Sequence, residues 1–193
     1  MPYCEYLYVS LQSYDSKVSA SNQNSDQMSE ESDIREVFAP RISKTTVRDL
    51  YDLAKWMKSE GANFNSYCIV DLTDPISEGH EITGHGSSWF YRYTERGTTD
   101  IVASFPTSAE LVFFAYDKIR LDPWAWVHCV AMVSSNQKRK EVAAELARRD
   151  IAFYSDIVPA YDSVGEPMHR VFVFGNDRHK VNDIRHVEHF SLN

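Results

Sequence analysis

The chain has 193 residues, 43% of them hydrophobic, which is enough to bury one full-sized core, so we expect a single domain over residues 1–193. Its formal net charge is −8, and residues 1–86 hold 7 Lys and Arg against 14 Asp and Glu. This balance excludes a protein built for nonspecific phosphate binding, and the short apolar runs exclude a membrane helix of roughly 18 residues.

The cysteines and the first residues indicate the compartment. Cys4, Cys68 and Cys129 are widely spaced and form no CxxC pair, so neither a disulfide framework nor a zinc knuckle is predicted. The first five residues lack the basic start and apolar middle of a signal peptide. We therefore expect a cytoplasmic protein without a cofactor.

The N-terminal region contains a predicted strand followed by a polar stretch. Residues 5–12 alternate aromatic or polar with aliphatic side chains, which predicts a β-strand. Residues 13–33 are rich in Ser, Asn, Gln and acids, so burial cannot offset the entropy of ordering them. We predict a mobile acidic loop at about 15–32. Disorder without a role is the simpler interpretation of this loop, and a binding role is the alternative.

A helix is predicted within residues 43–61, because apolar side chains recur there at helical spacing. Thr46 and Asp49 form a plausible capping box at its start, and Gly61 supplies the stop. Residues 66–72 then read as a buried strand. The Pro- and Gly-punctuated stretch 73–86 reads as a connection without regular structure.

The rest of the chain alternates strands and helices. A hairpin is expected from two strands, 87–94 and 99–105, joined around residues 95–98. The helix predicted from Thr107 to 121 has apolar residues on nearly every side, which is typical of a fully buried helix. The remaining predicted elements are a strand at 126–133, a surface helix at 136–150 capped by Asn136, strands at 151–158 and 169–175, and a last helix from Asn176.

This order predicts the fold class. Hairpin-like pairs interrupt the alternation of strand and helix, which favours an α+β fold with a mixed or antiparallel sheet and helices packed mainly on one face, ferredoxin-like in part. The glycine-rich phosphate loops and the nucleophile elbow of common enzyme folds are absent from the sequence.

The stretch EGHEITGHG at 78–86 is the strongest candidate for a metal site. Together with Asp71, its two histidines, His80 and His85, offer donors that suit zinc, manganese or iron. The two histidines are five residues apart in a glycine-rich segment, so no regular helix brings their rings together. A solvated turn is therefore the preferred interpretation, and the alternatives are a binding loop of unspecified ligand and a metal site built on Asp71, His80 and His85.

Other catalytic arrangements are incomplete. Cys129 follows His128 on a predicted strand, where neighbouring side chains point to opposite faces, so the two cannot act as nucleophile and base. No ExK or DxD spacing accompanies the carboxylates at the predicted strand ends. We therefore expect no catalytic activity.

The strand at 87–94 concentrates aromatic side chains on one face. That face holds Trp89, Tyr91 and Tyr93, and the opposite face holds Phe90, Arg92 and Thr94. Such a face serves as a stacking platform for RNA bases, as an anchor for a protein partner, or as plain core.

From these observations we predict a non-catalytic binding protein whose partner is a protein or nucleoprotein complex. Phages and plasmids use small acidic proteins of this kind to inhibit host nucleic-acid machinery. The alternatives are a metal-dependent hydrolase or nuclease and an RNA-binding domain. Direct nucleic-acid binding is expected to be weak or absent, because Glu145 interrupts the basic residues of the 136–150 helix. The residues expected to contact the partner are Trp89, Tyr91, Arg92, Tyr93, Glu30 and Glu31.

Overall fold

The computed structural model describes residues 33–159 and 167–187. By its internal contacts the chain divides into two units, Met1–Glu31 and Ser32–Asn193, and the fold below concerns the second. The predicted strand at 5–12 and the predicted acidic loop at about 15–32 lie outside the described residues, as do Glu30 and Glu31.

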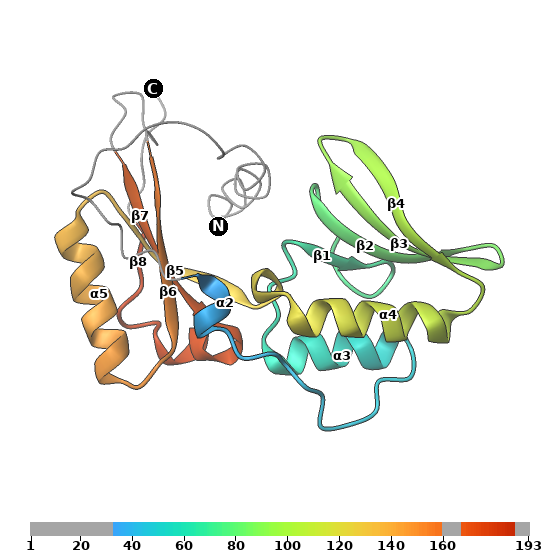
Figure 1. Ribbon diagram of the computed structural model, residues 1–193, viewed down its shortest axis with the longest axis horizontal. Helices are drawn as coiled ribbons and strands as arrows, with labels where there is room; N and C mark the ends of the chain where they lie inside the picture. Colours follow the sequence, from blue (N-terminus) through green and yellow to red (C-terminus); the bar gives the residue numbers. More distant parts are fainter. Residues whose placement is uncertain (1–32, 160–166, 188–193) are drawn as a thin grey trace. The chain divides into compact units, whose positions relative to one another are not determined.

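Two four-stranded sheets, named sheet A and sheet B, form the framework of the described residues (Figure 1). The strands of sheet A are β1 Tyr67–Ile69, β2 Gly79–His85, β3 Ser88–Glu95 and β4 Thr98–Phe105. They lie in the order β1-β2-β3-β4, and only β1 and β2 are parallel. The strands of sheet B are β5 Val127–Val133, β6 Phe153–Val158, β7 Met168–Phe174 and β8 His186–Val187. Their order is β6-β7-β5-β8, with β5 and β8 parallel.

Helices cover these sheets. The described α-helices are α2 Ile34–Val37, α3 Leu50–Glu60, α4 Ser108–Leu121 and α5 Asn136–Arg148, and the two 3₁₀ helices are η1 Pro123–Ala125 and η2 Gly175–Lys180. Figure 1 shows α3 and α4 together beneath sheet A and α5 along sheet B. Helices combined with mixed sheets confirm the predicted α+β class. No helix among the described residues combines the length and the apolar character needed to cross a membrane.

Sheet B accounts for the ferredoxin-like part of the prediction. Its elements β5, α5, β6 and β7 follow the β-α-β-β order of that arrangement, with β7 between β6 and β5. After β7 the short helix η2 stands where a second crossover helix would be, and β8 runs parallel to β5. The structure is therefore consistent with a partial ferredoxin-like arrangement.

Three predicted element boundaries are wrong. Helix α3 is capped by Asp49, whose carboxylate accepts a hydrogen bond from the Asp52 backbone N–H at 2.8 Å, so Thr46 lies outside the helix. Helix α5 is capped by Ser135 instead of Asn136. The predicted last helix from Asn176 is replaced by η2 and β8.

The stretch 73–86 is also more regular than predicted, because residues 79–85 form β2. Its hydrogen-bonding groups pair with β1 on one side and with β3 on the other. Positions 79 and 84 of this strand require glycine, because a side chain at either position would clash with its neighbours. A Cβ on Gly79 would lie 2.4 Å from the Ser66 carbonyl oxygen, and one on Gly84 would lie 2.6 Å from the Trp89 ring.

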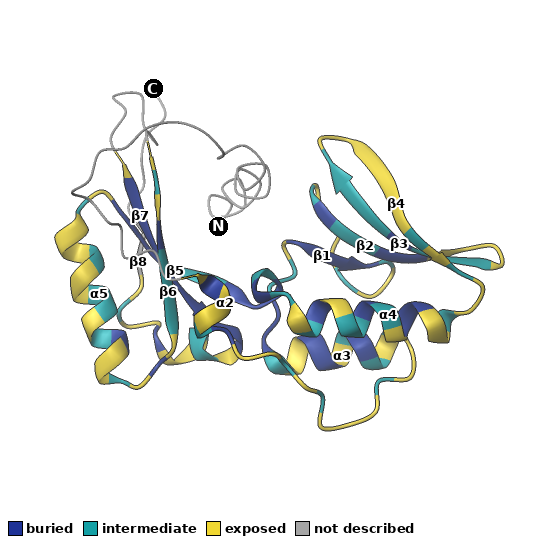
Figure 2. Cartoon of the chain, viewed as in Figure 1, coloured by how far each residue is buried: buried dark blue, intermediate teal, exposed yellow. Residues whose placement is uncertain are grey.

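Apolar side chains fill the space between each sheet and its helices, and Figure 2 shows these buried stretches in dark blue. The core beneath sheet A contains Leu53, Met57, Ile69, Ile82 and Leu111. The core between sheet B and α5 contains Val130, Ala131, Leu146, Ile151, Val171, Val173 and Val181. Strand β7 of sheet B is buried along its whole length, whereas β4 of sheet A is largely exposed and leaves part of that sheet available for contacts.

Candidate protein-binding surface

His80, the first histidine of the EGHEITGHG stretch, is enclosed by aromatic rings. Its ring centroid lies 5.2 Å from Tyr67, 4.9 Å from Tyr91 and 5.2 Å from Tyr93. Burial lowers the pKa of His80, and the negative charge of Asp122 opposes that shift. His80 is thus a neutral packing residue at neutral pH, with its ring faces occupied by tyrosines.

The other two residues of the alternative metal site lie elsewhere. His85 is exposed and is five residues from His80 on β2, so the two side chains point to opposite faces of sheet A. Asp71 lies beyond the end of β1 in a left-handed conformation, with φ of 68°. Within residues 33–159 and 167–187, no group of three or more His, Cys, Asp or Glu side chains is placed to hold a metal ion.

The three aromatic residues of β3 share one face, and it faces α4. Tyr91 is only 3% exposed, and its ring packs against Phe114 of α4 with centroids 5.3 Å apart. Burial raises the pKa of Tyr91 well above its usual value. Tyr91 is therefore a core residue, whereas Trp89 and Tyr93 are half-buried beside it.

Arg92 lies on the other face of β3. Its guanidinium group is 3.6 Å from the Glu81 carboxylate and stacks over the Phe90 ring at 4.9 Å. An arginine held in this way keeps its aliphatic stem against the sheet. Of the residues predicted to contact a partner and described by the structure, Trp89, Arg92 and Tyr93 retain accessible surface.

Helix α4 is not buried on all sides, and this corrects the prediction. Its buried residues lie on the side that faces sheet A and α3, and they are Leu111, Val112, Ala115 and Ile119. Phe113, on the opposite side, is 76% exposed. The helix packs in a two-layer arrangement, so four consecutive apolar residues at 111–114 cannot all face the core.

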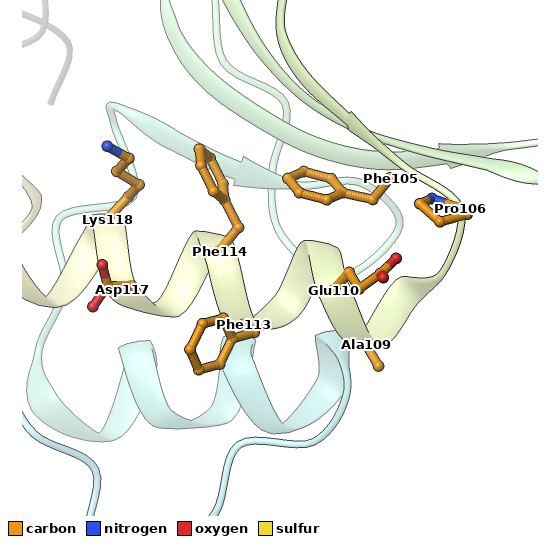
Figure 3. Close-up of a pocket in the computed structure, with 8 residues that line it drawn as sticks. All are labelled: Phe105, Pro106, Ala109, Glu110, Phe113, Phe114, Asp117 and Lys118. Carbon is orange, nitrogen blue, oxygen red and sulfur yellow. The ribbon is translucent and has the colours of Figure 1, made fainter.

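An open groove of about 700 Å³ runs beside Phe113. Phe105 and Phe114 form one wall, with ring centroids 5.2 Å apart, and Figure 3 shows both rings between α4 and the sheet. Phe113 points away from Phe114 on the other side of the helix (Figure 3). The groove surface, as we name it, comprises Phe105, Pro106, Ala109, Phe113 and Phe114 with the charged residues Glu110, Asp117 and Lys118.

The charged residues of the groove surface are partly paired. Lys118 lies 5.4 Å from the centre of the Phe114 ring, which favours a cation–π contact. Asp117 accepts a hydrogen bond from Arg120 at 2.6 Å. Glu110 is exposed and accepts a hydrogen bond from the Thr107 hydroxyl group at the start of the helix. The groove surface is therefore apolar at its centre and charged at its rim, as protein-binding surfaces are.

Strand β4, which ends at the groove surface, is an edge of sheet A. Its neighbour is β3, and in the described part of the chain no strand pairs with its other side. Ile101 is 59% exposed and Val102 is 53% exposed. The pairing with β3 shifts by one residue at Val102, which is a β-bulge.

The sequence reasoning missed Phe113 and Phe105 as surface residues. Periodicity alone could have found Phe113, because Ala109, Glu110, Phe113 and Asp117 fall on one helical face that is half charged. Phe105 carries no such signal, since its exposure depends on where α4 begins.

Comparison with known proteins gives no match to this chain among family models, curated proteins or solved structures.

Proposed function

We propose that the protein is a non-catalytic binding protein and that it holds a protein partner on the groove surface. The observation that carries the proposal is the exposure of Phe113 next to an apolar groove. Isolated exposed apolar residues are common, but Phe113 adjoins a groove that is also lined by Phe105, Phe114 and Pro106, so it extends an apolar surface. Burying the Phe113 side chain against a partner would contribute about 2 kcal/mol.

The shape of the groove surface favours a macromolecule over a small ligand. Small-molecule sites are concave and enclose most of their ligand. Here the rings of Phe113 and Phe114 point to different sides of α4, so the apolar surface wraps around the helix instead of closing over a cavity (Figure 3). A protein surface with an apolar projection and a polar surround fits this shape.

Three side chains suited to acid–base or nucleophilic chemistry, those of His80, His128 and Cys129, pack or form hydrogen bonds within the fold. The His80 ring is enclosed by tyrosines, and the Nε2 of His128 lies 2.8 Å from the Gly61 carbonyl oxygen. The Cys129 thiol donates a hydrogen bond to the Ala131 carbonyl oxygen at 3.3 Å. These contacts support a binding role and disfavour the hydrolase alternative.

The charge of the chain supports a basic partner. A net charge of −8 attracts proteins whose own surfaces are positive, and nucleic-acid-binding proteins carry such surfaces. The specific form of our proposal is therefore an inhibitor, of the kind that phages and plasmids encode, which occupies a component of host nucleic-acid machinery.

Affinity capture from a lysate of the source organism, performed with and without nuclease, tests the kind of partner. We expect specific proteins to be retained in equal amounts after nuclease treatment, because the contact is made with the groove surface. Loss of all retained proteins after nuclease would show that nucleic acid mediates the contact, and the RNA-binding alternative would then take precedence. Catalytic turnover by the purified protein would contradict the non-catalytic part of the proposal.

A further inference from the structure

Within the described residues, β4 has a strand neighbour on one side only, and its other edge offers backbone hydrogen-bonding groups beside the groove surface. β4 has eight residues and β3 as its sheet neighbour, so alternate N–H and C=O groups face away from the sheet. Natural edge strands are often protected by lysine or proline, and β4 contains neither. The bulge at Val102 and the charge of Asp100 are the protective features within the strand.

The bulge has a geometric consequence. Asp100 pairs with Tyr93 and Phe105 pairs with Trp89, and the two partners lie four residues apart on one face of β3. Asp100 and Phe105 are five residues apart, yet the extra residue at the bulge places both on this same face, which faces α4. The Asp100 carboxylate and the Phe105 wall of the groove surface are thereby aligned along one face of this edge strand.

The charges near the edge of β4 distinguish two possible occupants, a second copy of this chain and a basic segment of a partner protein. The hairpin end carries Glu78 and Glu95, whose negative charges raise the pKa of Tyr93 after the larger effect of its burial. Arg96 of the turn pairs with Glu95 at 3.8 Å and offsets one of these charges, so the hairpin end remains acidic through Glu78 and the nearby Asp100. Asp100 lies opposite Tyr93, and Glu110 lies on the groove surface at the other end of the strand. A second copy paired antiparallel through β4 would bring the acidic hairpin end of each copy toward Glu110 of the other. Like charges therefore disfavour a second copy and favour a basic segment.

We propose that β4 receives an extended segment of the partner as an added strand. The segment carries a lysine or arginine opposite Asp100 and a large apolar side chain opposite Phe105, in the groove surface. On β3, which has no bulge, the residues opposite Asp100 and Phe105 are Tyr93 and Trp89, four residues apart. We expect the same spacing in the added strand, so its basic and its apolar side chain are four residues apart. This inference rests on the proposed function and specifies the chemistry of its partner.

A library of random peptides, each roughly 8 residues long, provides the probe. Selection on the purified full-length protein is expected to enrich peptides with a basic residue and an aromatic or large aliphatic residue spaced by four. Binding is expected to slow amide hydrogen exchange at residues 98–105. Two versions of the best peptide are then compared, one methylated at its odd-numbered and one at its even-numbered backbone nitrogens. One version should lose binding and the other should keep it, because only one of these sets of N–H groups faces β4.

Two charge variants test the contact with Asp100. Asp100→Lys is expected to weaken the selected peptides about fivefold. Glu141→Lys makes the same change of charge on an exposed residue of α5 and is expected to leave the affinity unchanged. Equal effects of the two variants would mean that the peptides respond to net charge alone, and the proposed pairing with Asp100 would be wrong.

The other outcomes separate this inference from the proposed function. Peptides that lose binding on Phe113→Ser but tolerate both methylation patterns would use the groove surface without adding a strand, so only the further inference would fail. An absence of binding peptides, or binders indifferent to Phe113→Ser, would contradict the proposed function as well. A dimer with slowed exchange at residues 98–105 and no peptide present would show that the occupant is a second copy.

Discussion

His128 is a single residue that joins two elements of the fold through its side chain. Its Nε2–H donates a hydrogen bond to the Gly61 carbonyl oxygen, which joins β5 to the end of α3. Burial is the main cause that lowers the pKa of His128 to about 4, and the hydrogen bond to Gly61 opposes the shift. The positive charges of Arg178, His179 and Arg185 act in the same direction as burial. His128 is therefore neutral in the folded protein.

We expect acid to destabilise the protein through His128. The unfolded chain takes up this proton near the ordinary value of 6.5, whereas the folded chain takes it up near 4. The unfolded state therefore binds more protons between these values, and the free energy of unfolding falls as the pH drops from 6.5 to 4. The part due to His128 is about 3 kcal/mol by pH 4.

Urea unfolding at several pH values checks this expectation. His128→Gln can keep a donor for the Gly61 carbonyl oxygen without titrating, so its stability should fall less with acid than that of the natural protein. His85→Gln is the matched control, because His85 is exposed. Parallel pH profiles for the natural protein and His128→Gln would contradict the assignment.

Gly61 supports a second prediction at this scale. It ends α3 with φ of 78°, and a Cβ at this position would lie 2.6 Å from the backbone of Gly175 and Asn176. Gly61→Ala is expected to destabilise the protein by about 3 kcal/mol, from backbone strain plus the clash. Gly97→Ala has a similar φ of 79° and open space around its Cβ, so it should cost about 1 kcal/mol. Equal losses in thermal unfolding would show that the close approach at Gly61 does not matter.

At the scale of elements, the sequence predicted those whose signals are local. The hairpin was predicted from residues 95–98, and its turn places Arg96 and Gly97 at positive φ between β3 and β4. Strand β2 was missed because its stability comes from pairing on both sides, and its glycines and histidines resemble a loop. The exposure of Phe113 was missed because it depends on which sides of α4 other elements cover.

The start of α3 provides a test of one corrected boundary. Asp49 caps the helix through its hydrogen bond to the Asp52 N–H, whereas Thr46 is exposed outside the helix. Asp49→Ala is expected to lower the free energy of unfolding by about 1 kcal/mol, and Thr46→Ala by no more than a few tenths. Chemical denaturation of the two variants measures this, and a larger loss for Thr46→Ala would restore the predicted capping box.

At the scale of the whole molecule, charge determines which partners can bind. The basic residues of α5 do not form a free stripe, because Arg148 and Arg149 both pair with Glu145, and Arg149 also pairs with Asp183. Together with the net charge of −8, this leaves little positive field for a phosphate backbone.

We therefore expect duplex DNA to bind with a dissociation constant weaker than about 10 μM at physiological salt. A salt titration of binding to single- and double-stranded DNA and RNA measures this. Changing Lys138, Arg139 and Lys140 to Glu should not reduce the amount of partner protein recovered by capture. A submicromolar affinity for nucleic acid that falls steeply with salt and is weakened by these three changes would mean that nucleic acid is the main partner.

The central claim is that the groove surface binds a protein, and two exposed aromatic residues provide a matched test. Phe113 on α4 is 76% exposed and Tyr51 on α3 is 65% exposed, but only Phe113 lines the groove. Neither change to Ser should alter the melting temperature by more than a few degrees, since neither residue lies in the core.

The decisive measurement is the affinity of the nuclease-resistant partner for the natural protein and these two variants, determined by calorimetric titration. We predict that Phe113→Ser weakens binding about tenfold or more, as expected for an aromatic anchor, and that Tyr51→Ser leaves it unchanged. Unchanged affinity for Phe113→Ser, or an equal loss for both variants, would contradict the account.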